Sequence, residues 1–183
     1  MEKAIDSALV QRFGCFQSLN AEQIAAFATH LEEVTLPPGK ILFTQGDPGD
    51  SFYLVLTGEI VIKLGAPAQD DRTLATLGPG AILGEMGPLV NTPRTATAIS
   101  SAESQLWRIS TLSFHEGLRR GDAWATTFLL ATAQVLGRRV IVMNEELLKL
   151  SAEFRGNLAQ PQIRKAVAEI EQLRKRLTTE WTF

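Results

Sequence analysis

Residues 80–98 combine residue types that could hold an anion next to a hydroxylated group. Gly84 follows the apolar pair Ile82-Leu83, and residues 85–89 are long enough for one helical turn. The free backbone N–H groups of a first helical turn attract an anion. Arg94 and Thr95 then add a guanidinium fork and a hydroxyl, which together suit a phosphate. Glu85 would repel a phosphate, so its carboxylate is better suited to accept hydrogen bonds from sugar hydroxyls. The stretch predicts a compact ligand with one anionic group and a diol or a single hydroxyl.

The elements that must position these residues are short apolar runs, separated by turn residues, between residues 36 and 108. The runs cover residues 41–43, 52–56, 60–62, 73–77, 81–83, 95–99 and 104–109. Many short strands with frequent Gly, Pro, Asp and Asn between them are typical of an antiparallel β-sandwich or barrel. Helical patterns flank this region on both sides. The sequence therefore predicts a mainly β fold with flanking helices (α+β).

Four helical segments are predicted. The first lies within residues 3–33, where Asn20 and Gln23 form a capping-box pattern. A short helix over 111–118 follows the strands, and Asp122 is the expected N-cap of a long helix to about residue 154. Gly156-Asn157 ends it, and Pro161 suits the first turn of a last helix to about residue 177. We divide the chain into residues 1–121, 122–155 and 156–183.

The long helix carries a regular apolar seam at spacings of four and three. The seam consists of Leu129, Ala133, Leu136, Val140, Met143, Leu147, Leu150 and Phe154. This rhythm is that of a heptad repeat and favours a two-helix dimer. A helix packed on its own barrel would need a wider stripe, which Val135 and Val142 could supply. Both interpretations remain open from the sequence.

Composition limits the class of protein. The chain has 183 residues, with 18 Lys plus Arg against 20 Asp plus Glu, and the net charge of −2 argues against a general nucleic-acid coat. A single cysteine excludes a disulfide framework and a cysteine-based zinc site, and two histidines are too few for a histidine-rich metal centre. No apolar run approaches the roughly 18–20 residues of a membrane span. We expect one cytoplasmic domain with a short appendage, without metal.

Two separated segments are similar to the cyclic-nucleotide-binding domain family, the module of catabolite activator protein, of protein kinase A and G regulatory segments and of cyclic-nucleotide-gated channels. One is Gly84-Glu85-Met86-Gly87 through Arg94-Thr95-Ala96, which resembles the family's phosphate-binding cassette. The other runs over residues 38–60. The resemblance covers roughly residues 9–150. It implies an antiparallel β-roll or jelly-roll barrel of the cyclic-nucleotide-binding type with a long C-terminal helix.

The resemblance implies a role for each residue of the cassette. Arg94 would pair with the cyclic phosphate and Glu85 with the ribose 2′-hydroxyl, while amides after the Gly84-Glu85 pair, at Met86 and Gly87, would help to hold phosphate and sugar. Thr95 fits a cGMP or a cAMP binder. Pro88 departs from the usual pattern, since proline has no N–H to donate. The residues expected around the purine are Leu83, Val61 and Ile62.

The family's long helix caps the purine, which nominates Arg139, Met143 and Asn144. Met143 also lies on the seam, so pure packing is its alternative role. Asn144 could contact a purine edge or face solvent. These three assignments rest on the resemblance together with the position of Arg138-Arg139 in the helix.

The expected function is an allosteric receptor for a cyclic mononucleotide, with cAMP favoured and cGMP possible. Only 29 residues follow Phe154, too few for the helix-turn-helix of the family's transcription factors. We therefore expect a stand-alone homodimer that acts through an unknown effector protein, without membrane or nucleic acid. The alternatives are a ligand-free dimerisation or docking scaffold and a fragment of a larger regulated protein. A small-barrel enzyme would need about three metal ligands on neighbouring strands, and neither histidine lies on a predicted strand.

Overall fold

The computed structural model describes residue 10 and residues 13–64, 72–155, 168, 169 and 172. The chain divides into two compact units, Met1–Ala133 and Gln134–Phe183. The first unit holds all the strands of the described residues, and the second holds the distal part of the long helix.

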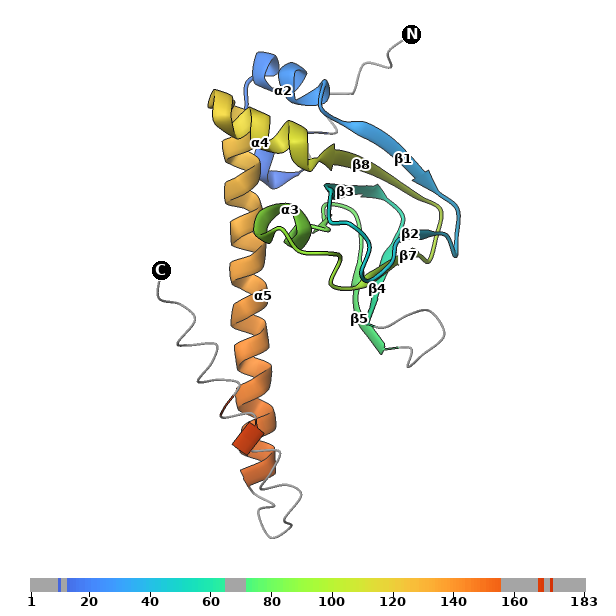
Figure 1. Ribbon diagram of the computed structural model, residues 1–183, viewed down its shortest axis with the longest axis vertical. Helices are drawn as coiled ribbons and strands as arrows, with labels where there is room; N and C mark the ends of the chain where they lie inside the picture. The colour runs from blue at the N-terminus through green and yellow to red at the C-terminus, as the bar shows by residue number, and fades with distance from the viewer. Residues whose placement is uncertain (1–9, 11–12, 65–71, 156–167, 170–171, 173–183) are drawn as a thin grey trace. The chain divides into compact units, whose positions relative to one another are not determined.

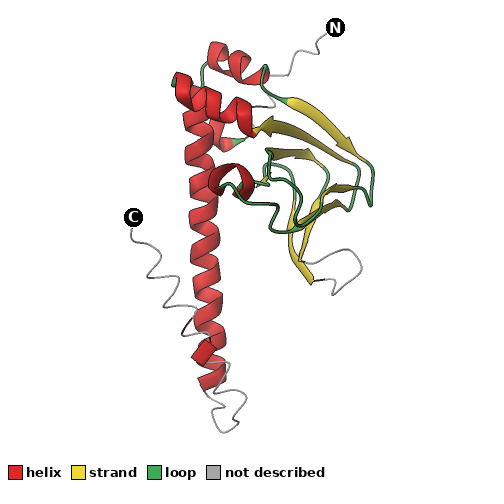
Figure 2. Cartoon of the chain, viewed as in Figure 1, coloured by secondary structure: helices red, strands yellow, loops and turns green. Residues whose placement is uncertain are grey.

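Two four-stranded antiparallel sheets form the β part of the described chain (Figures 1 and 2). The first has the order β1 (Glu32–Leu36), β8 (Ser104–Ser110), β3 (Ser51–Thr57) and β6 (Ile82–Leu83). The second has the order β2 (Ile41–Phe43), β7 (Thr97–Ser100), β4 (Ile60–Leu64) and β5 (Arg72–Leu77). A core joins them, with Tyr53, Leu83 and Leu106 from one sheet and Ile60 and Ala98 from the other. The predicted antiparallel β-roll is confirmed, as two sheets rather than a closed barrel.

The helices of the described chain precede, interrupt and follow the strands (Figure 2). They are the 3₁₀ turn η1 (Gly14–Phe16), α2 (Ala21–Ala28), α3 (Met86–Val90), α4 (Thr111–Arg120) and α5 (Ala123–Arg155). The capping box at the start of α2 is confirmed. Asn20 Oδ1 accepts from the Gln23 amide at 2.9 Å, and the Gln23 side chain accepts from the Asn20 amide at 3.0 Å. The predicted helix from Pro161 lies outside the described residues, apart from positions 168, 169 and 172.

The N-terminal prediction was wrong in one respect. Helix α2 ends at Ala28, and Glu32 and Glu33, the last residues of the predicted helical segment, belong to strand β1. Strand β1 pairs along its whole length with β8, from Glu32 opposite Arg108 to Leu36 opposite Ser104. The local pattern favoured a helix up to Glu33, but the hydrogen bonds and side-chain contacts of a long-range strand pair outweigh such weak propensities.

An aromatic cluster packs the helices against the first sheet. Phe52 of β3 contacts Phe114 of α4 and Phe128 of α5, with ring centroids 4.9 Å and 5.0 Å apart. Phe27 of α2 stacks on Trp124 at 5.2 Å. All five rings are buried. The first turns of α5 are therefore part of the core of the first unit.

The expectation that no segment is apolar enough to cross a membrane needs correction for α5. Residues Ala123–Leu150 have the length of a membrane span and a mean hydropathy of 1.2 over an 18-residue window. A helix that is partly buried in a protein core passes the same test, and Trp124, Phe128 and Ala131 are buried. Arg138 and Arg139 also lie within this stretch. Length and composition are thus weak evidence for a membrane span here.

Candidate functional site

Arg94 lies between α3 and β7 with its side chain turned into the protein. Only 4% of the residue is exposed. Its Nη1 donates to the carbonyl oxygens of Ser51 and Gly84, both at 2.8 Å, and its Nη2 donates to Ser51 Oγ at 2.9 Å. The guanidinium thus joins the start of β3 to the end of β6. Both ends of the predicted cassette, Gly84 and Arg94, are brought into contact.

A chain of ion pairs leads outward from Arg94. Arg94 Nη2 lies 3.5 Å from Asp50 Oδ1, Asp50 Oδ2 lies 3.2 Å from Arg108, and Arg108 lies 2.8 Å from Glu32. Partial burial opposes ionisation of Asp50, but a hydrogen bond from the Ser51 hydroxyl and the charges of Arg108 and Arg94 outweigh it. The pKa of this carboxyl therefore lies below its ordinary value. Asp50 is ionised at neutral pH and orients two arginines.

Aromatic rings and an unmet hydrogen bond complete the surroundings of Arg94. The guanidinium carbon lies 4.4 Å from the ring centroid of Phe43 and 5.6 Å from that of Tyr53. Burial lowers the pKa of Arg94 from its ordinary value, although an arginine stays charged at any physiological pH. Its Nε is buried and has no hydrogen-bond partner among the described residues. A buried donor of this kind is rare and calls for an acceptor.

Glycine is required both in the turn before α3 and in the first turn of α3. Gly84 has φ +76°, and a Cβ there would lie 2.6 Å from Arg94 Nη1 and 3.1 Å from the Ser51 carbonyl oxygen. A Cβ on Gly87 would lie 2.6 Å from the carbonyl oxygen of Gly49. The prediction that Gly84 permits an unusual turn and a close approach is confirmed. Glu85, between them, is only 4% exposed.

The loop after β2 holds the backbone of Arg94. The Arg94 amide donates to the Asp47 carbonyl at 2.8 Å, and the Gly46 amide donates to the Arg94 carbonyl at 2.9 Å. Gly46 and Asp47 belong to the upstream segment of residues 38–60, so the two segments singled out in the sequence meet in space. The roles of Ser51, Phe43 and Tyr53 around Arg94 were not predicted, because a sequence does not show which strand residues face a distant arginine.

The other predicted ligand residues fall into three groups. Met86 is half-buried and Thr95 is exposed, next to the cassette residues already described. Leu83 is buried, and Ile62 packs on the same core, whereas alternation along β4 puts Val61 on the other face of its sheet. Arg139, Met143 and Asn144 are exposed residues of α5 in the second unit. Their assignments to a purine site stay predictions.

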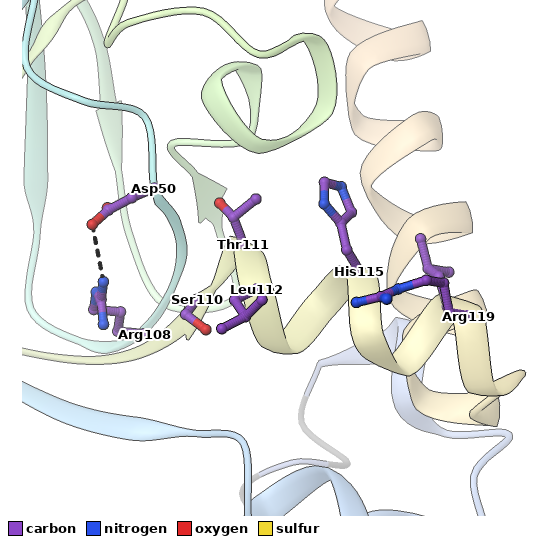
Figure 3. A pocket seen from close by; sticks show the side chains of 8 residues that line it. Asp50, Arg108, Ser110, Thr111, Leu112, His115 and Arg119 are labelled. Carbon is purple, nitrogen blue, oxygen red and sulfur yellow. Dashed lines mark hydrogen bonds and ion pairs between the residues drawn. The ribbon is translucent and has the colours of Figure 1, made fainter.

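An open groove of about 870 Å³ lies beside α4 and was not predicted (Figure 3). Its walls are Asp50, Arg108, Ser110, Thr111, Leu112, His115, Leu118 and Arg119. Asp50 and Arg108 form the ion pair drawn in Figure 3. Since Asp50 also contacts Arg94, the groove adjoins the network around the cassette. No group of three or more His, Cys, Asp or Glu residues within the described chain could hold a metal ion.

Comparisons with known proteins agree with this geometry. A family model described as the cyclic nucleotide-binding domain matches residues 33–120. A cAMP-dependent protein kinase regulatory subunit of Eremothecium gossypii is 34% identical over 120 residues, which cover 66% of this chain and 25% of the relative. A CRP-like cAMP-activated global transcriptional regulator of Mycobacterium tuberculosis is 33% identical over 95 residues, or 52% of this chain and 42% of the relative. The chain thus spans less than half the length of these two relatives.

A solved structure is similar over most of its length. The N-terminal domain of a transcriptional regulator from Streptomyces coelicolor A3(2) has 32% sequence identity and a TM-score of 0.59, and the match covers 72% of this chain and 94% of that one. The matched family model includes both the cassette and the loop that holds Arg94. The chain belongs to the cyclic nucleotide-binding domain family.

Proposed function

We propose that the chain is a cytoplasmic receptor that binds one cyclic mononucleotide, cAMP in preference to cGMP, and acts by allosteric regulation rather than catalysis. The observation that carries this proposal is the buried guanidinium of Arg94, whose Nε has no acceptor in the described structure. A cyclic phosphate would supply an anionic acceptor to a group that is already positioned. The preference for cAMP is supported by the names of the two curated relatives, a cAMP-dependent and a cAMP-activated regulator.

A calorimetric titration tests the proposal directly. We expect saturable binding of cAMP with one site per chain, weaker binding of cGMP, and far weaker binding of linear 5′-AMP, whose doubly charged phosphate does not match the single charge of a cyclic ester. No saturable heat with any cyclic mononucleotide up to about 1 mM would overturn the receptor assignment and leave the ligand-free scaffold.

Glu85 is proposed to accept a hydrogen bond from the ribose 2′-hydroxyl. Hydrogen bonds to a charged group contribute about 1.5–3 kcal/mol, so Glu85→Ala should weaken cAMP binding by about tenfold or more. The same variant should bind cAMP and 2′-deoxy-cAMP with nearly equal affinity, because the group that distinguishes them is gone. A variant that still prefers cAMP over the deoxy ligand as strongly as the natural chain would exclude this role for Glu85.

Dimerisation through the seam of α5 is also a proposal. Leu129 is 36% exposed, and Leu136 and Val140 are half-buried. Glutamates at Leu136 and Val140 would place unpaired charges in the contact between the two α5 helices, and burying an unpaired charge destabilises such a contact. We expect Leu136→Glu with Val140→Glu to be a monomer by light scattering at tens of micromolar, where the natural chain is a dimer.

The matched control places the same charges on another face of α5. Ile141 and Leu148 are 59% and 55% exposed and lie off the seam, so Ile141→Glu with Leu148→Glu should remain a dimer. A natural chain that is monomeric, or a control that dissociates as readily as the seam variant, would count against the seam.

Signalling is proposed to run from the cassette to α5. Ser51 holds the Arg94 guanidinium, and its neighbour Phe52 packs against Phe128 of α5. A ligand that binds one arrangement of these groups better will shift the equilibrium toward it. We expect cAMP to change hydrogen exchange in residues 84–95 and also in 138–150 and 163–177. A response confined to the cassette would mean binding without this output to an effector protein.

A further inference from the structure

The distal part of α5 presents apolar side chains that a folded protein normally covers. Met143 and Leu150 are 45% and 43% exposed, and half-buried Leu147 lies between them at the spacing of the seam. Phe154 continues the same pattern in the sequence. An exposed apolar stripe that repeats at heptad spacing marks a contact surface.

The chain that follows α5 carries a matching stripe. Ile163, Ala166, Ile170, Leu173 and Leu177 are spaced by three, four, three and four residues, the rhythm of a heptad repeat. Positions 168, 169 and 172, the described residues of this segment, are helical. The intervening residues 156–161 begin with Gly-Asn and end with proline, which are signals for the end of one helix and the start of another.

The two stripes match in one antiparallel alignment. A connection of six residues is within the usual range for neighbouring helices in a bundle, and such neighbours run antiparallel. When the chain is folded back at Gln160, each residue lies opposite the one that is equally far from Gln160 in the sequence. The four apolar pairs formed in this way are Phe154 with Ala166, Leu150 with Ile170, Leu147 with Leu173, and Met143 with Leu177. A single alignment therefore pairs every seam position from 143 to 154 with an apolar residue.

The charges support the same alignment. Reading α5 from residue 145 to 153, negative and positive residues alternate, and the terminal segment read backward shows the opposite order. The opposed groups are Glu145-Glu146 with residues 174–176, Lys149 with Glu169 and Glu171, and Glu153 with Arg164-Lys165, each centred between Leu158 and Pro161. Lys149 also pairs with Glu146 of its own helix at 2.7 Å. A parallel second copy along the distal seam would instead place Glu145-Glu146, Lys149 and Glu153 beside the same residues of its partner, and like charges repel.

We propose that residues 163–177 fold back on the distal seam of α5 as an antiparallel helical hairpin within one chain. The short connection gives this segment an effective concentration in the millimolar range, which a separate copy does not reach. The hairpin covers two apolar stripes with one contact. It confines the proposed dimer contact to the proximal seam at Leu129, Leu136 and Val140.

Cysteine pairing tests this arrangement. The full chain has one cysteine, Cys15, so Cys15→Ser provides a background in which Leu150→Cys and Ile170→Cys are the only thiols. Mild oxidation should give a disulfide within one chain, seen as monomer mass on a non-reducing gel with both thiols lost. Leu148→Cys with Ile170→Cys is the matched control, because Leu148 lies on another face of α5, and it should oxidise at least about tenfold more slowly.

Two results would overturn the proposal. Disulfides formed only between chains would assign the distal seam to a second copy, and equal rates for the two cysteine pairs would mean that the segment has no fixed place on α5. Adding Leu173→Glu to the chain with Leu150→Cys and Ile170→Cys should slow disulfide formation to the rate of the Leu148→Cys control. The new charge replaces one member of a central apolar pair. The measurement uses no nucleotide, so its outcome is independent of the proposed ligand.

Discussion

Replacing Arg94 by alanine should lower the affinity for cAMP at least about tenfold. Removing one partner of a buried, charge-assisted pair costs on the order of 2–5 kcal/mol, and 1.4 kcal/mol already corresponds to tenfold. Arg94 is only 4% exposed and is held at Ser51 and Gly84 before any ligand arrives. The contribution of its guanidinium to cAMP binding is therefore pre-organised, and no other residue of the described chain occupies the same position. Calorimetry on the natural chain and on Arg94→Ala gives the comparison.

The same variant also loses four internal hydrogen bonds, the one to Asp50 included, so its stability must be measured beside its affinity. Arg94→Lys keeps a positive charge but lacks the planar fork, and it should bind with intermediate affinity. Arg119→Ala, at an arginine side chain that is 72% exposed, should leave affinity unchanged. If Arg94→Ala and Arg94→Lys are folded by circular dichroism and bind cAMP as the natural chain does, the cassette is not the anion site.

Much of the β part could be predicted because its signals are local. Turn residues separate the apolar runs, and each predicted run contains or overlaps one observed strand, from β2 through β8. The capping pair Asn20 and Gln23 is a local signal too, and it is found as expected. The unusual backbone at Gly84 followed from a glycine between a strand and a helical turn.

What the sequence did not predict depends on contacts between distant residues. Strand β1 exists because β8 pairs with it, and nothing within residues 32–36 signals this partner. Asp50 could be placed in a turn from its neighbours, but its position between Arg94 and Arg108 depends on three separate elements. The groove beside α4 is a space between side chains, which sequence patterns do not describe.

Gly84→Ala should impair binding and stability together, whereas Gly80→Ala should impair stability alone. Both glycines have a positive φ, +76° and +88°, so either alanine is strained by about 1–2 kcal/mol. For a chain of this size, that strain should lower the melting temperature by about 2–8 °C. A Cβ at Gly80 meets nothing within 4 Å, but one at Gly84 would lie 2.6 Å from Arg94 Nη1.

The difference in cAMP affinity between the two variants therefore measures how much the position of the Arg94 guanidinium contributes to binding. The Arg94 side chain can move away from a new methyl group, but it then leaves the Gly84 and Ser51 carbonyls that aim it. We expect Gly84→Ala to bind cAMP at least about tenfold more weakly, which corresponds to a loss of about 1.4 kcal/mol of binding free energy. Gly80→Ala should bind cAMP within about twofold of the natural chain. Thermal unfolding and calorimetry on both variants provide the measurement. Equal affinities for the two would mean that the placement of Arg94 by Gly84 does not matter for the ligand, because the backbone strain is the same in each.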